Sequence, residues 1–211
     1  AGHRWLGLDV DPAPGVAALA DDPVLGPLVR ARPHLRVPGG TDPFETALLV
    51  VLGQHVSLAA GRVFAARLVA AHGVGCTAGA PGHHRGTRLE ELRQLPSPEV
   101  LAALDPLDLQ VTVGITTARA RTVVAIARAV ADGTPAWATR AALLSIHGVG
   151  PWTADLVALR ALRDPDVFLP GDLVLRKALG GVTAKEAASL AQAWRPHRSL
   201  AVLHLWTHHA I

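Results

Sequence analysis

The chain has 211 residues, of which 50% are hydrophobic, enough to bury the core of one large domain or two small ones. Its single cysteine, Cys76, excludes both an internal disulfide framework and a four-cysteine iron–sulfur cluster. No apolar run is long enough to cross a bilayer and no signal-peptide pattern opens the chain, so we expect no membrane contact. The formal net charge of +3 permits nucleic acid binding without establishing it.

Local signals predict a mainly α-helical fold. Side chains that can cap helices, prolines at first helical positions and glycines at helix ends recur along the chain. They predict helices over 16–31 (broken by two prolines), 43–52, 58–72 and 117–131, with shorter ones after Pro98, Pro106, Thr183 and Pro196. The alternating apolar residues of 1–10 instead predict a short strand. The glycine-rich segment 73–88 predicts a surface loop.

The stretch between Thr139 and Asp172 carries the most specific signals. Thr139 can cap a short first helix, and Gly148 and Gly150 bracket a turn at its tightest points. Pro151 then stands where a helix tolerates proline best, and apolar residues at helical spacing continue a second helix. The amino end of that helix has N–H groups without intrahelical partners beside two glycines. This arrangement suits an anion such as a DNA phosphate.

Four segments of the chain carry a family resemblance. They are 37–57 (VPGGTDPFETALLVVLGQHVS), 148–155 (GVGPWTAD), 166–179 (DVFLPGDLVLRKAL) and 194–206 (WRPHRSLAVLHLW). Together they resemble the helix-hairpin-helix DNA glycosylases, and most closely the AlkA type of bacteria. The resemblance runs over about 32–206, most of the chain. A Gly-x-Gly turn alone would be weak support, but the hairpin followed by Pro-Gly-Asp with matching flanks is specific.

The resemblance implies a mainly α-helical fold with two helical lobes that flank an active-site cleft. Residues 16–42 and 166–211 would form one lobe, and 43–165, with the helix-hairpin-helix at 139–163, would form the other. Residues 1–15 would be the remaining strand and linker of the amino-terminal β domain that AlkA-type proteins have. The chain lacks an initiator methionine, and the sequence leaves open whether it is the carboxyl-terminal part of a longer fusion protein.

Asp172 is the predicted catalytic residue. Cleavage of a base–sugar bond builds positive oxocarbenium character on the deoxyribose, which a nearby carboxylate stabilises while it orients or deprotonates water. On the residues alone, capping of the following helix explains Asp172 equally well, and the resemblance favours catalysis. Trp152 stands where the strand-cutting glycosylases of this superfamily carry a lysine nucleophile. An indole cannot form a Schiff base, so the enzyme is expected to be monofunctional.

The predicted base pocket contains Trp152, Trp206 and Leu156. The resemblance implies that the two tryptophans stack on a flipped base, and their faces would attract the positive charge of an alkylated purine. Ordinary core packing is the alternative for each of them. A tyrosine of the family falls on Leu156, so the pocket departs from the family pattern at this position.

Two regions are predicted to contact DNA. Gln54 and His55 match the family loop whose side chain fills the gap left by the flipped base, and an exposed junction histidine is the alternative. At the hairpin the predicted contacts are Gly148, Val149, Gly150 and Thr153. Family hairpins also hold a monovalent cation, which implies a structural Na⁺ or K⁺ on the backbone carbonyls of Leu144, Ile146 and Val149. No other cofactor is expected.

The sequence thus predicts a monofunctional DNA-N-glycosylase that flips and hydrolytically excises alkylated bases, of the 3-methyladenine type, from duplex DNA. We expect a monomer that acts in the bacterial cytoplasm, at the nucleoid. Two alternatives stay open: a non-catalytic helix-hairpin-helix module that only binds DNA, and a glycosylase for a different damaged base.

Overall fold

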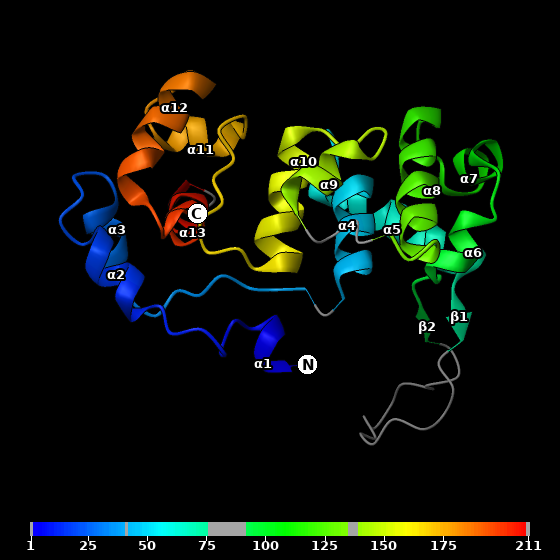
Figure 1. Ribbon diagram of the computed structural model, residues 1–211, viewed down its shortest axis with the longest axis horizontal. Helices are drawn as coiled ribbons and strands as arrows, with labels where there is room; N and C mark the ends of the chain where they lie inside the picture. The colour runs from blue at the N-terminus through cyan, green and yellow to red at the C-terminus, as the bar shows by residue number, and fades with distance from the viewer. Residues whose placement is uncertain (1, 41, 76–91, 135–138, 210–211) are drawn as a thin grey trace. The chain divides into compact units, whose positions relative to one another are not determined.

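The structure is a computed structural model that describes residues 2–40, 42–75, 92–134 and 139–209. Within these ranges the fold is mainly α-helical, as the sequence predicts (Figure 1). The helices before residue 135 are α1 (Gly2–Trp5), α2 (Ala13–Leu19), α3 (Leu25–Ala31), α4 (Pro43–Leu52), α5 (Leu58–His72), α6 (Pro98–Ala102), α7 (Pro106–Val113) and α8 (Thr117–Ala131). Those after it are α9 (Arg140–Ser145), α10 (Pro151–Val157), the π-helical turn η2 (Ala158–Leu162), α11 (Leu173–Ala178), α12 (Ala184–Leu190), the 3₁₀ turn η3 (Ala191–Trp194) and α13 (Arg198–His209).

The strands described are two residues long. β1 (Val74–Gly75) pairs antiparallel with β2 (Arg93–Gln94). Most of the predicted loop over 73–88 lies outside the described residues. In the part of the chain that is described, no helix combines the length and the apolar character that crossing a bilayer needs.

Capping side chains set several helix boundaries where the sequence predicts them. The Ser57 hydroxyl accepts the Ala60 N–H at 3.2 Å at the start of α5. At α12, Thr183 and Glu186 satisfy each other's backbone N–H groups in a reciprocal capping box. α10 begins with Pro151, whose missing N–H costs nothing at that position.

Two compact units divide the chain. Unit 1 comprises Ala1–Thr46 and Gly150–Ile211, and unit 2 comprises Ala47–Val149. These boundaries differ from the predicted ones, which placed both helices of the hairpin in the central lobe. The second hairpin helix belongs to unit 1 because Ala158 and Leu159, which continue it, are buried in the core of that unit.

The core of unit 1 joins residues from both ends of the chain. Leu25 of α3 lies in one hydrophobic cluster with Leu200 and Leu205 of α13, and the two helices pack against each other. Phe168 meets Trp194 edge-on, with the ring centroids 5.7 Å apart and the ring planes at 69°. This core supports α10, the loop before α11, and α13.

The core of unit 2 centres on α8. This helix buries Ala120, Val123, Val124 and Ala127 at helical spacing, and α6 and α7 pack against it. Gly114 ends α7 in the left-handed conformation, with φ of +77°, which glycine adopts without steric cost.

The strand predicted within 1–10 does not form. The segment begins as helix α1, and the Leu6 N–H donates to the Gly2 carbonyl at 3.1 Å. No described strand lies alongside the segment, so an extended conformation would leave its backbone groups without a ladder partner. The segment is attached instead through side chains, and the Arg4 guanidinium donates to the Ala161 carbonyl at 2.9 Å.

Candidate active site

Asp172 accepts hydrogen bonds on both carboxylate oxygens. Oδ2 accepts the indole N–H of Trp152 at 3.2 Å, and Oδ1 accepts the indole N–H of Trp206 at 3.2 Å. Oδ1 also accepts the Leu175 N–H at 3.0 Å, which makes Asp172 the N-cap of α11. The capping interpretation of Asp172 is therefore confirmed, and the same carboxylate faces the two tryptophans that the resemblance assigns to its site, while its catalytic role stays a prediction.

Three separate elements of unit 1 bring this cluster together. Trp152 lies in the first turn of α10, and Trp206 lies on α13, the last helix. Asp172 follows a turn in which its own N–H donates to the Leu169 carbonyl at 3.0 Å. Because Leu169 is buried in the core of unit 1, that turn anchors the carboxylate next to both indoles.

The cluster is half-buried. Trp152, Leu156 and Trp206 are partly exposed, and all three pack against the hydrophobic core of unit 1. Asp172 is also partly exposed. A carboxylate held in one orientation beside partly open aromatic side chains can stabilise a positive charge that develops next to it. The three predicted pocket residues thus pack against the same hydrophobic core.

Arg160 belongs to this neighbourhood, and the sequence analysis missed it. Its guanidinium carbon lies 5.9 Å from the ring centroid of Trp206. Its Nη1 donates to the Pro38 carbonyl at 3.3 Å, and burial lowers the pKa of the guanidinium from its ordinary value. Nothing in the sequence distinguishes this arginine from its exposed counterparts, because the contact depends on how η2 and α13 pack.

The predicted plug loop lies in unit 2, directly after α4. His55 is exposed and has φ of 53°, a left-handed conformation that is uncommon for residues other than glycine. The Gln54 carbonyl accepts a hydrogen bond from the Arg119 guanidinium, which lies 5.6 Å from the Phe64 ring centroid. Burial lowers the pKa of Arg119, which the sequence did not single out.

The two hairpin glycines have different surroundings. Gly148 has φ of +83°, and a Cβ there would lie 1.9 Å from Oγ1 of Thr122 on α8. Gly148 is therefore required by packing inside unit 2. A Cβ at Gly150 would meet no atom within 4 Å. Packing alone thus explains Gly148 but not Gly150, and the contact of the two glycines with a DNA phosphate stays a prediction.

Comparison with known proteins adds relatives that share most of this chain. A Mycobacterium tuberculosis protein named "Probable bifunctional transcriptional activator/DNA repair enzyme AlkA" is 41% identical over 97% of this chain and 41% of its own length. The DNA-3-methyladenine glycosylase 2 of Escherichia coli is 35% identical over 86% of this chain and 63% of its own length. The chain therefore spans less than two thirds of either relative. No family model matches it.

A solved structure supports the same fold. The 3-methyladenine DNA glycosylase from Archaeoglobus fulgidus superimposes with a TM-score of 0.80, at 20% identity, over 99% of this chain and 73% of the other. In sequence and fold the chain resembles the AlkA type of the helix-hairpin-helix DNA glycosylases. In this chain the predicted hairpin turn lies between α9 and α10.

Thr153, a predicted DNA contact, is only 4% exposed. Its side chain faces the protein interior from the first turn of α10, because the helix turns this position toward the core. The prediction is corrected accordingly: the side chain offers no surface to DNA in this conformation. Only the backbone of this first helical turn remains for such a contact.

The carbonyls predicted to hold a monovalent cation come from the last turn of α9, at Leu144, and from the turn after it, at Ile146 and Val149. The Ile146 carbonyl accepts the Val149 N–H at 3.0 Å, which closes the hairpin turn and uses one of its two lone pairs. Leu144, Ile146 and Val149 all contribute neutral oxygen atoms, the ligand type that hard cations prefer. The donor set therefore fits Na⁺ or K⁺, and the assignment of this cation site stays a prediction.

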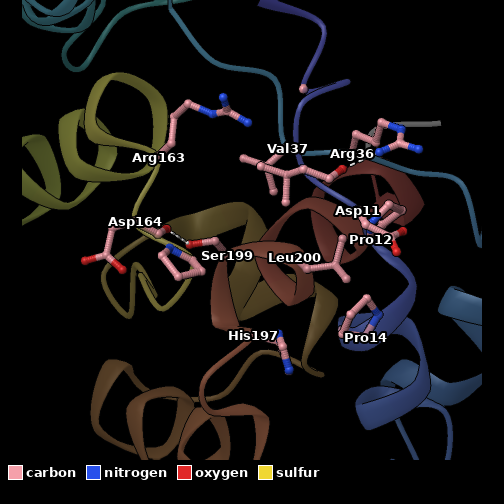
Figure 2. Close-up of a pocket in the computed structure, with 14 residues that line it drawn as sticks. Asp11, Pro12, Pro14, Arg36, Val37, Arg163, Asp164, His197, Ser199 and Leu200 are labelled. Atoms are coloured by element: carbon pink, nitrogen blue, oxygen red, sulfur yellow. Dashed lines mark hydrogen bonds between the residues drawn. The ribbon is translucent and has the colours of Figure 1, made fainter. Parts of the chain in front are cut away.

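A separate cavity of about 250 Å³ lies within unit 1 (Figure 2). Prolines at the start of α2 and the first residues of α13 line it, including Pro12, Pro14 and Leu200. At its margin Arg163 pairs with Asp9. Neither Asp172 nor either of its tryptophan partners lines this cavity, so it is distinct from the predicted base pocket.

Proposed function

We propose that the chain is the catalytic portion of a monofunctional DNA glycosylase that removes alkylated bases, of the 3-methyladenine type, from duplex DNA. The observation that carries the proposal is the Asp172 carboxylate, held at 3.2 Å by the indole N–H groups of both Trp152 and Trp206. The relatives named as AlkA and DNA-3-methyladenine glycosylase 2 support the choice of alkylated bases. The proposal is for a monomer.

The proposed mechanism assigns binding to the tryptophans and charge stabilisation to Asp172. The damaged nucleotide leaves the duplex, and its base stacks on the exposed aromatic surface of Trp152 and Trp206. As the base–sugar bond breaks, the deoxyribose gains positive charge, which the fixed Asp172 carboxylate stabilises. The same carboxylate orients the water that attacks the sugar and accepts its proton. The indole N–H groups keep the carboxylate in place.

Strand cleavage lies outside the proposed activity. A lyase needs an amine that forms a Schiff base with the sugar, and Trp152 stands at the position that would supply it. The two lysines of the chain, Lys177 on α11 and Lys185 on α12, are both exposed. Borohydride trapping should therefore yield no covalent protein–DNA adduct. An adduct formed as efficiently as by a known lyase would contradict this part of the proposal.

DNA contacts are proposed at two segments. At the hairpin, the open surface at Gly150 and the first turn of α10 would receive a backbone phosphate. A monovalent cation on the carbonyls of Leu144, Ile146 and Val149 would add positive charge for that phosphate, and no other cofactor is proposed. In unit 2, exposed His55 and the adjacent Gln54 would fill the gap left by the flipped base.

The deciding experiment is incubation of the protein with alkylated duplex DNA, followed by chromatographic identification of released bases. We expect free 3-methyladenine and an intact abasic strand. DNA binding without base release would favour the alternative, a non-catalytic helix-hairpin-helix module that only binds DNA. Release of an oxidised base but no alkylated base, from matched duplexes, would assign the site to a different lesion.

A further inference from the structure

The Trp206 indole lies between two opposite charges. Its N–H donates to Oδ1 of Asp172 at 3.2 Å, while the guanidinium carbon of Arg160 lies 5.9 Å from its ring centroid. Among the described residues no carboxylate forms an ion pair with Arg160, and the hydrogen bond to Pro38 is with a neutral carbonyl. The positive charge of this half-buried arginine therefore rests mainly against the aromatic ring.

A cation in this place changes what the ring can attract. An aromatic face binds a cation through its quadrupole, and here a guanidinium already uses that attraction. A second cation stacked on the same indole is repelled by the first. At a separation of about 8 Å in partly buried surroundings, two unit charges interact strongly enough to change an equilibrium by roughly tenfold. A neutral base of the same size experiences no such repulsion.

We propose that Arg160 is a specificity-determining residue that disfavours formally cationic bases relative to neutral damaged purines. The inference rests on the proposed function, because it concerns the base that stacks on Trp206. It modifies the expectation that the tryptophans select cationic lesions through their aromatic faces.

The test compares two lesions in otherwise identical duplexes. One carries 7-methylguanine, which has a formal positive charge, and the other carries hypoxanthine, which is neutral. Single-turnover release is measured with the wild-type protein, Arg160→Met and Arg160→Lys. The control is Arg163→Met, which removes a positive charge that Asp9 balances. Because both rates come from the same preparation, their ratio does not depend on the fraction of folded protein.

Removal of the Arg160 charge should raise the cationic-to-neutral rate ratio. We expect an increase of about tenfold in Arg160→Met, and a ratio within about twofold of wild type in Arg160→Lys and Arg163→Met. An unchanged ratio in Arg160→Met overturns the inference, and so does an equal increase in Arg160→Lys or Arg163→Met. A folded wild-type protein that releases neither base overturns the proposed function instead.

Discussion

Unit 1 contains two aspartates that use the same interactions in different surroundings. Asp22 accepts the N–H of Leu25, the first residue of α3, at 2.8 Å, and its other oxygen accepts the indole N–H of Trp194 at 2.7 Å. Asp172 likewise caps α11 and accepts indole N–H groups from Trp152 and Trp206. Each aspartate thus accepts both a backbone N–H at the start of a helix and the indole N–H of at least one tryptophan.

The difference between these two sites lies in the exposure of the tryptophans. Trp194 is 3% exposed and meets Phe168 within the core, so nothing can stack on it from outside. Trp152 and Trp206 remain partly exposed, so a base can approach the same side chains that hold Asp172. A carboxylate with indole partners is therefore structural in one place and fit for catalysis in the other. Hydrogen bonding alone would not distinguish the two.

Replacement of each aspartate by asparagine should separate these roles most strongly. In Asp172→Asn the new side chain would still cap α11, but it would lose the negative charge and place an amide donor against an indole N–H. For this variant we expect base release to fall by about a hundredfold or more, with DNA binding nearly unchanged. For Asp22→Asn we expect normal release and a loss of about 1–2 kcal/mol in the free energy of unfolding. Chemical denaturation and single-turnover assays measure both quantities.

An exchange of the two outcomes would assign catalysis to Asp22. Near-normal turnover by a folded Asp172→Asn variant would remove Asp172 from the reaction.

Replacement of tryptophan by phenylalanine compares the two sites through the indole N–H groups that donate to the aspartates. Trp206→Phe keeps an aromatic face but removes the N–H that holds Oδ1 of Asp172. A carboxylate with one remaining indole donor is less well oriented, and we expect base release to slow by roughly tenfold. Trp194→Phe should instead lower the free energy of unfolding by about 1.5–3 kcal/mol, since it removes a hydrogen bond to a charged group. Equal rates for both variants would show that the Trp206 N–H has no part in the reaction.

The two hairpin glycines allow a second comparison, in which one glycine is needed for packing and the other is predicted to contact DNA. Gly148→Ala forces a Cβ to within 1.9 Å of Oγ1 of Thr122 at positive φ, so we expect a loss of about 2 kcal/mol or more in the free energy of unfolding.

The Cβ of Gly150→Ala meets no protein atom within 4 Å, so this variant should leave the free energy of unfolding unchanged. Its added methyl group should weaken duplex binding about threefold, independent of sequence, because it obstructs a phosphate. Fluorescence anisotropy at fixed salt checks the binding, since salt alone changes such affinities. Unaltered affinity of Gly150→Ala would exclude this part of the hairpin from the DNA contact.

Much of the fold was predictable because its signals are local. Thr139, Ser57 and the Thr183–Glu186 box begin helices where the sequence placed them, since each cap needs only residues within one turn. Asp172 and its two tryptophans were assigned to one site through the family resemblance rather than through spacing. Their hydrogen bonds depend on how α10, α11 and α13 pack, which no local pattern encodes.

The predictions that failed depended on distant contacts. Residues 2–10 alternate like a strand, but no described strand pairs with them. Thr153 lies beside the hairpin in sequence, yet the turn of α10 directs its side chain inward. Arg119 and Arg160 were indistinguishable from surface arginines until the positions of Phe64 and Trp206 were known. The assignment of His55 as the plug of the duplex stays a prediction.

The smallest expected effect concerns two histidines on α13, the helix that carries Trp206. His204 is 1% exposed, whereas His208, one turn later, is exposed. Burial and the charge of Arg32 lower the pKa of His204, while the nearby Leu28 backbone opposes them, and neither ring nitrogen has a hydrogen-bond partner among the described residues. The unfolded chain, whose histidines have pKa values of about 6.5, therefore binds a proton on this residue more readily than the folded chain does.

The sign of the pH dependence follows from this difference. The stability that depends on neutral His204 is fully present above pH of about 6.5 and is lost as the pH falls through the lowered folded-state pKa. One such group changes the free energy of unfolding by at most about 1.4 kcal/mol per pH unit. Denaturation of the wild type at pH 7.5 and pH 5.5 should show a decline that is smaller in His204→Leu. His208→Leu should decline as the wild type does, because an exposed imidazole is solvated in both states. The contrary outcome is an equal decline of the free energy of unfolding in the two variants. That outcome would show that His204 is not the source of the acid sensitivity, which would then come from another group.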